Sequence, residues 1–108
     1  MPNESQPFTL VYASLTKDHL RAIEAKYYSL IRNAINEQLS FEPTIETRNR
    51  KPLKRPVMFM ATWEIRFGPQ NRFRVYYDVD LDQQLVSILA IGYKHDNRII
   101  IGGEEIQL

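Results

Sequence analysis

Residues 61–91 read ATWEIRFGPQNRFRVYYDVDLDQQLVSILAI. Aromatic and β-branched residues alternate with polar ones in this stretch, and turn-forming residues divide it at 68–71 and 80–82. Such a pattern is typical of consecutive β-strands joined by short turns. It predicts an antiparallel meander with strands at 61–67, 72–79, 85–91 and 98–101.

The alternation also sorts the side chains of the first two strands onto two faces, because successive residues in a strand point to opposite sides of the sheet. One face collects apolar side chains: Trp63, Ile65, Phe67, Phe73, Val75, Tyr77 and Val79. The other collects polar and basic ones: Thr62, Glu64, Arg66, Arg72, Arg74, Tyr76 and Asp78. The apolar face therefore needs an element to cover it.

The N-terminal half supplies that element. Residues 8–12 form a short β-prone run, and apolar residues between 16 and 39 recur at steps of three and four, as in an amphipathic helix that ends before Pro43. We expect an α+β fold in which an N-terminal strand and a long helix, or a helical hairpin, pack on one face of an antiparallel sheet. Both forms of the helical region stay open, because neither glycine nor proline interrupts it.

Size and composition indicate one domain spanning residues 1–108, with residues 1–7 as a flexible polar N-terminus. The chain has no cysteine, no signal-peptide pattern and no apolar run near the roughly 20 residues of a membrane span. These features predict a cytoplasmic protein without a membrane partner.

Charge is distributed unevenly along the chain. Residues 48–74 contain eight basic residues and one acid, Glu64, for a net charge of +7, whereas the rest of the chain carries −6. Residues 44–56, rich in proline and basic residues, are expected to form a basic surface connection. A basic patch of this kind suits a phosphate backbone or an acidic partner.

Several kinds of catalytic site find no support. The two histidines, His19 and His95, do not have the spacing of metal ligands, and no serine-nucleophile motif occurs. The Gly102–Gly103 pair lacks the helix-forming lysine or serine element of a phosphate-binding loop and is predicted to form a turn. We therefore expect neither a metal nor a cofactor.

The basic and aromatic residues suit phosphate chemistry instead. Cleavage of RNA by its own 2′-hydroxyl requires positive charge at the phosphorus and groups that move protons, and it requires no metal. The catalytic candidates are Arg66, Arg74, Lys94 and His95, and the RNA-binding candidates are Lys51, Lys54, Arg55, Arg72 and Tyr76. A structural alternative is that Arg66 and Arg74 form cross-strand ion pairs with Glu64 and Asp78.

Four segments, taken in order, resemble the RelE/ParE toxin superfamily: Leu53-Lys54, WEIRFG at 63–68, RFRVYYDV at 72–79 and ILAIGYK at 88–94. The resemblance implies the toxin of a bacterial type II toxin–antitoxin system, neutralised by a cognate antitoxin. RelE-type members cut messenger RNA within the ribosome without metal, whereas ParE-type members inhibit DNA gyrase. By this resemblance Arg66, Arg74 and Lys94 match basic positions of the RelE-type active face, and Lys54 or Arg55 helps to hold the RNA backbone.

The chain departs from the RelE-type pattern at two positions. Ile100 stands where the nucleases often carry a tyrosine or histidine, and Glu64 stands where a more basic residue is common. Three functions remain open: a ribosome-dependent messenger RNA endoribonuclease, a ParE-like binder that inhibits gyrase, and a toxin-fold interaction module without activity.

Overall fold

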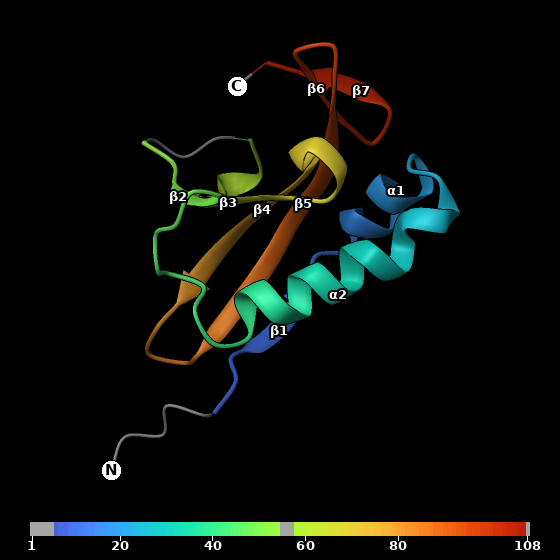
Figure 1. The fold of residues 1–108 in the computed structure, drawn as a ribbon. Helices are drawn as coiled ribbons and strands as arrows, with labels where there is room; N and C mark the ends of the chain where they lie inside the picture. Colours follow the sequence, from blue (N-terminus) through green and yellow to red (C-terminus); the bar gives the residue numbers. More distant parts are fainter. Residues whose placement is uncertain (1–5, 55–57, 108) are drawn as a thin grey trace.

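The computed structural model describes residues 6–54 and 58–107, so Met1–Ser5 of the expected flexible N-terminus and the side chain of Arg55 lie outside the described part. Two α-helices lie beside a seven-stranded sheet (Figure 1). The helices are α1 (Leu15–Arg21) and α2 (Tyr28–Leu39). The strands are β1 (Thr9–Tyr12), β2 (Arg50–Pro52), β3 (Trp63–Phe67), β4 (Phe73–Asp80), β5 (Leu85–His95), β6 (Arg98–Ile101) and β7 (Glu104–Ile106).

The sheet confirms the predicted antiparallel meander. Its order is β2-β3-β4-β5-β6-β7, and each of these neighbours is antiparallel. Strand β1 joins in parallel beside Leu85–Ile88, while β6 pairs with the distal part of β5 from Gly92 to His95. The α+β class, with its N-terminal strand and helical region against the sheet, is therefore confirmed.

Strand β5 pairs with β1 through Leu85–Ile88 and with β6 through Gly92–His95, so Leu89–Ile91 have no paired residue in either strand. The N–H of Ile91 donates instead to Nδ1 of His19, at 3.2 Å, from helix α1. Burial lowers the pKa of His19, which favours the neutral ring that this bond requires. His19 thus fills the gap in the hydrogen bonding of β5.

The helical region consists of two helices, so the single continuous helix is wrong and the divided form is correct. The chain leaves α1 at Ala22 and passes through extended backbone at Glu24 before a 3-10 turn at Ala25–Tyr27 leads into α2. Across this break the Tyr28 hydroxyl donates to the carbonyl of Leu20 at 2.7 Å. The apolar spacing continues through the break because Ile23 is itself buried in the core.

The main core lies between α2 and the apolar face of the sheet, as the alternation predicts. Its fully buried side chains come from α2 and from the central strands: Ile31, Ile35, Leu39, Ile65, Phe73, Val75, Tyr77, Val86, Ile88 and Ile91. In β5 the residues facing α2 change from even to odd numbers, because the extra residue Leu89 makes a bulge opposite Tyr76 and Tyr77. Burial of these side chains stabilises the fold by the hydrophobic effect.

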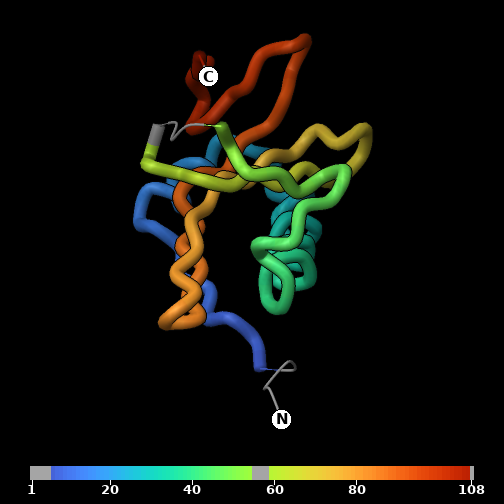
Figure 2. The backbone as a smooth tube through the Cα atoms, turned by 90° about the vertical axis from the view of Figure 1, so that its left-hand side faces the viewer, coloured from blue at the N-terminus to red at the C-terminus, as the bar shows by residue number. Residues whose placement is uncertain are grey.

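Two strands were not predicted. Strand β2 lies inside residues 44–56, so this segment is in part a sheet edge and not only a surface connection. Its Arg50 is buried and donates to the carbonyls of Gln38 and Ile45, where it closes the C-terminal end of α2 against the following loop. Figure 2 shows this segment, in green, returning alongside α2 before it enters the sheet. Strand β7 follows the Gly102–Gly103 turn, in which both glycines have positive φ.

Candidate functional site

The open face of the sheet, opposite α2, carries a cluster of charged side chains. Arg66 and Arg74 are directly opposite each other on β3 and β4, and Glu64 is opposite Tyr76 in the next pair of the same face. The Nε of Arg66 donates to one Glu64 oxygen at 3.0 Å, and an Arg74 guanidinium nitrogen lies 3.8 Å from the other oxygen. We call Glu64, Arg66, Arg74 and Tyr76 the arginine cluster.

The two arginines of this cluster differ in exposure. The side chain of Arg66 is 47% exposed, whereas those of Arg74 and Glu64 are 7% and 9% exposed. Burial lowers the pKa of Arg74, the charge of Arg66 lowers it further, and Glu64 opposes both effects. Burying a charged group is costly unless a partner compensates it, so Glu64 stabilises Arg74 in this position.

Tyr76 is the most deeply buried member of the cluster and lies on β4, opposite Glu64. Its hydroxyl is buried and makes no hydrogen bond of normal geometry with the described residues, although it lies near Glu64. Burial, together with the Glu64 charge, raises the pKa of Tyr76 well above its ordinary value. The phenol therefore keeps its proton near neutral pH. Its ring packs with Ala61, Ala90 and Ile101 in a second, smaller apolar cluster.

Three lysines flank the arginine cluster on or beside the open face. Lys51 is opposite Glu64 on β2, where it pairs with Glu46 at 3.6 Å, and Lys54 is exposed just after β2. Lys94 is two residues beyond Gly92, which pairs with Arg74, so it shares the face of Arg74. The structure thus brings together Lys51, Arg66, Arg74, Tyr76 and Lys94.

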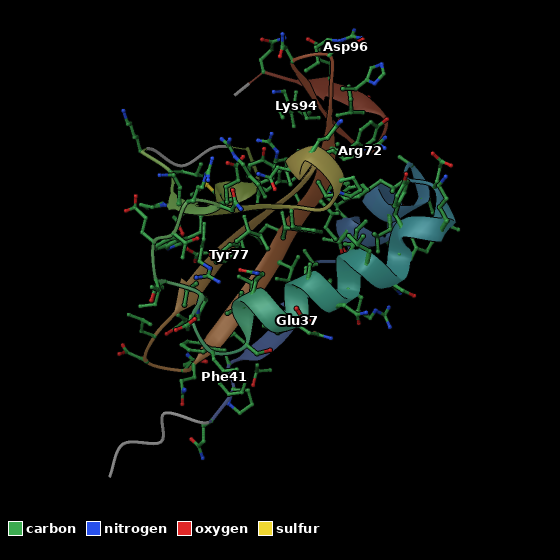
Figure 3. The ribbon with its side chains drawn as sticks, in the orientation of Figure 1. Glu37, Phe41, Arg72, Tyr77, Lys94 and Asp96 are labelled. Carbon is green, nitrogen blue, oxygen red and sulfur yellow. The ribbon has the colours of Figure 1, made fainter. Side chains whose placement is uncertain are left out.

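Two other predicted residues lie elsewhere. Arg72 precedes β4 with helical backbone angles, and its guanidinium lies over the rings of Tyr27, Phe73 and Tyr93, toward the helices. The expectation that Arg72 shares a face with Arg74 is therefore wrong. His95 is in β5 two residues after Tyr93, on the helix side, where it pairs with Asp96 at 3.4 Å. Figure 3 shows Arg72, Lys94 and Asp96 at one end of the molecule, far from Glu37 and Phe41 near the end of α2.

Glu64 is the group whose role sequence reasoning missed. The predicted cross-strand ion pair forms between Arg74 and Glu64, whereas the Arg66–Glu64 pair lies within β3. Asp78 pairs with neither arginine and accepts a hydrogen bond from the Thr62 hydroxyl. A carboxylate fixed between two guanidiniums can accept a proton, and the half-exposed guanidinium beside it can bind a phosphate. The sequence signal was the Glu-x-Arg spacing within one strand, which puts both side chains on one face.

A polar groove of about 560 Å³ adjoins Arg66 at the C-terminal end of β3. Its walls come from the end of α2, the loop before β2 and the turn after β3, and include Gln38, Asn49, Arg50 and Asn71. Across one side, the Asn71 side-chain amide donates to the Asn49 side-chain oxygen at 3.1 Å. The groove offers amide and guanidinium hydrogen-bonding groups next to the arginine cluster.

Neither described helix is long and apolar enough to cross a membrane. Within residues 6–54 and 58–107, no three acidic or histidine side chains gather as metal ligands would.

Comparison with known proteins identifies the fold. No protein-family model matches the sequence, and no curated protein matches it. Among solved structures, the chain is similar to a chain of the toxin–antitoxin complex RelBE2 from Mycobacterium tuberculosis, with a TM-score of 0.65 and 24% sequence identity. The match covers 82% of this chain and 99% of that chain. The chain has a RelE-like fold. In this RelE-like fold the arginine cluster occupies the face of the sheet that the helices leave open.

Proposed function

We propose that the chain is the toxin of a toxin–antitoxin pair and that it cleaves messenger RNA on the ribosome without a metal. The observation that carries this proposal is the arginine cluster, with a carboxylate between two guanidiniums on the open face of a RelE-like fold. The fold supports the toxin assignment and an antitoxin partner, and the cluster supports phosphate chemistry.

The proposed reaction is attack of a ribose 2′-hydroxyl on the adjacent phosphate. Glu64 takes the 2′-hydroxyl proton as the new bond to phosphorus forms and the bond to the 5′-oxygen breaks, which leaves a 2′,3′-cyclic phosphate. Arg66 is the guanidinium with enough exposure to bind the phosphate and stabilise its growing charge. The leaving 5′-oxygen takes a proton from Lys94 or from water.

Arg74 has a different role from Arg66. Its side chain is almost fully buried, so it has little surface for RNA. It is a positioning residue that fixes the Glu64 carboxylate through their ion pair. His95 lies on the helix side of the sheet, so it is replaced by Glu64 as the candidate proton acceptor. Lys51 and Lys54 remain candidates for binding the RNA backbone on the β2 side of the cleaved phosphate.

Induction of the chain in a bacterium tests this function against its alternatives. We expect growth arrest, rapid loss of protein synthesis and new 5′ ends inside translated messages. Arrest with a DNA-damage response and intact messages would instead indicate inhibition of gyrase. Normal growth with a folded, abundant product would indicate an interaction module without toxicity, and either result would overturn the proposal.

A further inference from the structure

A second site lies around Arg72, at the end of the sheet where β4 begins and β5 ends (Figure 3). The Arg72 guanidinium carbon is 5.4 Å from the ring centre of Tyr27, 5.6 Å from that of Phe73 and 5.9 Å from that of Tyr93. Contacts of this kind attract a cation to the face of an aromatic ring. Three rings, from the 3-10 turn at Ala25–Tyr27 and from β4 and β5, therefore hold one guanidinium in place.

The charge of Arg72 has no acidic partner among the described residues. Its one side-chain hydrogen bond in that part of the chain is a long 3.5 Å contact to the Tyr27 hydroxyl. Two acids line the hollows beside Arg72 without an ion pair to it: Glu24 pairs with Lys26 at 3.7 Å, and Asp96 lies 3.4 Å from the His95 ring. Since a guanidinium has five N–H donors, Arg72 has donors available for an anion.

Arg72 also separates two hollows in the surface. One, of about 190 Å³, has aromatic walls from Tyr27, Phe73 and Tyr93, with Glu24 and His95 also in its lining. The other, of about 250 Å³, is polar and is lined by Gln70, Arg72, Lys94, Asp96 and Asn97. Both are smaller than the roughly 300–1,000 Å³ of sites for drug-sized ligands, so each suits one part of a nucleotide.

The polar hollow connects this site to the open face. Lys94 lines that hollow and shares the face of Arg74, and its backbone N–H donates to the Arg72 carbonyl at 2.7 Å. Lys94 and Arg72 are therefore neighbours, so an RNA strand that passes over the arginine cluster and Lys94 can continue to Arg72. Aromatic rings beside a cation are the features that bind unpaired bases.

We propose that the aromatic hollow beside Arg72 binds one unpaired base of the RNA, a short distance from the cleaved phosphate, and that Arg72 binds a phosphate of the same nucleotide. This inference rests on the proposed function, because it assigns a further part of the same substrate. Tyr93 stacks on the base, and the polar hollow takes the sugar-phosphate backbone leading to Lys94.

The test is binding of a six-nucleotide single-stranded RNA, 2′-O-methylated to prevent cleavage and labelled with fluorescein, followed by fluorescence anisotropy at fixed salt. Six further RNAs each carry one abasic position. For the wild-type chain we expect one abasic position to weaken binding about fivefold or more, as for loss of one stacked base, and the others to have less effect. In Tyr93→Leu and in Arg72→Gln, the intact RNA binds more weakly and that abasic position has no further effect.

Three further variants separate the possible explanations. Tyr93→Phe keeps the ring and should bind like the wild type, which controls for loss of folding in Tyr93→Leu. Arg66→Gln should weaken binding of every RNA by a similar factor while the abasic effect persists. Lys17→Gln removes an exposed charge on α1 that lines neither hollow, and it should leave the abasic effect in place.

Each contrary outcome overturns a defined part of the account. If Arg66→Gln weakens binding but no abasic position matters, the base site is wrong and the proposed function stands. If the intact RNA does not bind, or if Arg66→Gln has no effect on its binding, the base site is wrong, and the induction experiment with mapping of 5′ ends decides the proposed function separately. If a hexaglutamate peptide displaces RNA from the wild type but not from Arg72→Gln, without any abasic effect, the site binds an acidic protein segment and not a base.

Discussion

The two faces of the central strands differ in what they bury. The face toward α2 buries apolar side chains such as Ile65, Val75 and Ile88, each 1% exposed or less. The open face buries Glu64 and Arg74, a carboxylate and a guanidinium, beside a smaller apolar cluster. Because buried charges contribute little to stability compared with apolar packing, our proposed function assigns the chemistry to this face.

The strongest test of this contrast removes the carboxylate of the open face. Glu64→Gln should lower the rate of messenger RNA cleavage about a hundredfold or more, because an amide cannot accept the 2′-hydroxyl proton. Primer extension on ribosome-bound message measures the rate, corrected for the folded fraction. Glu46→Gln is the matched control, since it removes an exposed carboxylate that pairs with Lys51. Cleavage that is unchanged in Glu64→Gln would remove Glu64 from the reaction.

Substitutions on the face that packs against α2 should change the free energy of unfolding more than the rate of cleavage. Ile35 is fully buried at the contact of α2 with the sheet, so Ile35→Ala should lower the free energy of unfolding by about 2–5 kcal/mol. Urea unfolding followed by circular dichroism measures this change. Leu30→Ala, at a 37% exposed position on the same helix, should cost much less. Equal losses in the two variants would contradict the assignment of the core, and the folded fraction of Ile35→Ala should still cleave RNA.

A smaller effect on the free energy of unfolding is expected from pH, through the contact of His19 in α1 with Ile91 in β5. The pKa of His19 is lowered in the folded chain, so the unfolded chain binds the proton first as the pH falls. The stability from His19 is complete above its ordinary pKa of 6.5 and decreases as the pH falls below that value. Urea midpoints measured from about pH 8 to about pH 5 should fall less steeply in His19→Gln than in the wild type. Identical slopes would show that the His19 bond to Ile91 is unimportant for folding.

The smallest effect is expected at Tyr76. Its buried hydroxyl makes no hydrogen bond of normal geometry, so Tyr76→Phe should change the free energy of unfolding by less than about 1 kcal/mol. Cleavage should also stay within a few-fold of the wild type. A large loss of cleavage at unchanged stability would show that the hydroxyl positions Glu64, and the open face would then need a third functional polar group.

The sequence predicted the sheet well because alternation in β3 and β4 reflects which side chains are buried. It missed β2 and β7 because each has three residues and is held by pairing with a neighbour, which composition does not record. It could not separate α1 from α2, since Ile23 in the break is as apolar as the helix residues around it.

The site was predicted in part. Arg66 and Arg74 meet on one face because both follow the period of a strand. Arg72 does not, because the backbone before β4 is helical and turns its side chain toward the rings. The role of Glu64 depends on two partners from different strands, and only the register of β3 and β4 places its carboxylate within reach of both.

The most direct test of the account compares two ion-paired arginines on opposite sides of the molecule. Arg66 is half-exposed beside Glu64, and Arg21 is exposed on α1 beside Asp18. In a reconstituted reaction with ribosomes and a defined message, Arg66→Ala should cut about a hundredfold more slowly than the wild type, while Arg21→Ala cuts at the wild-type rate. Equal cutting by both variants, or no cutting by the folded wild-type chain, would contradict the claim that the open face cleaves RNA.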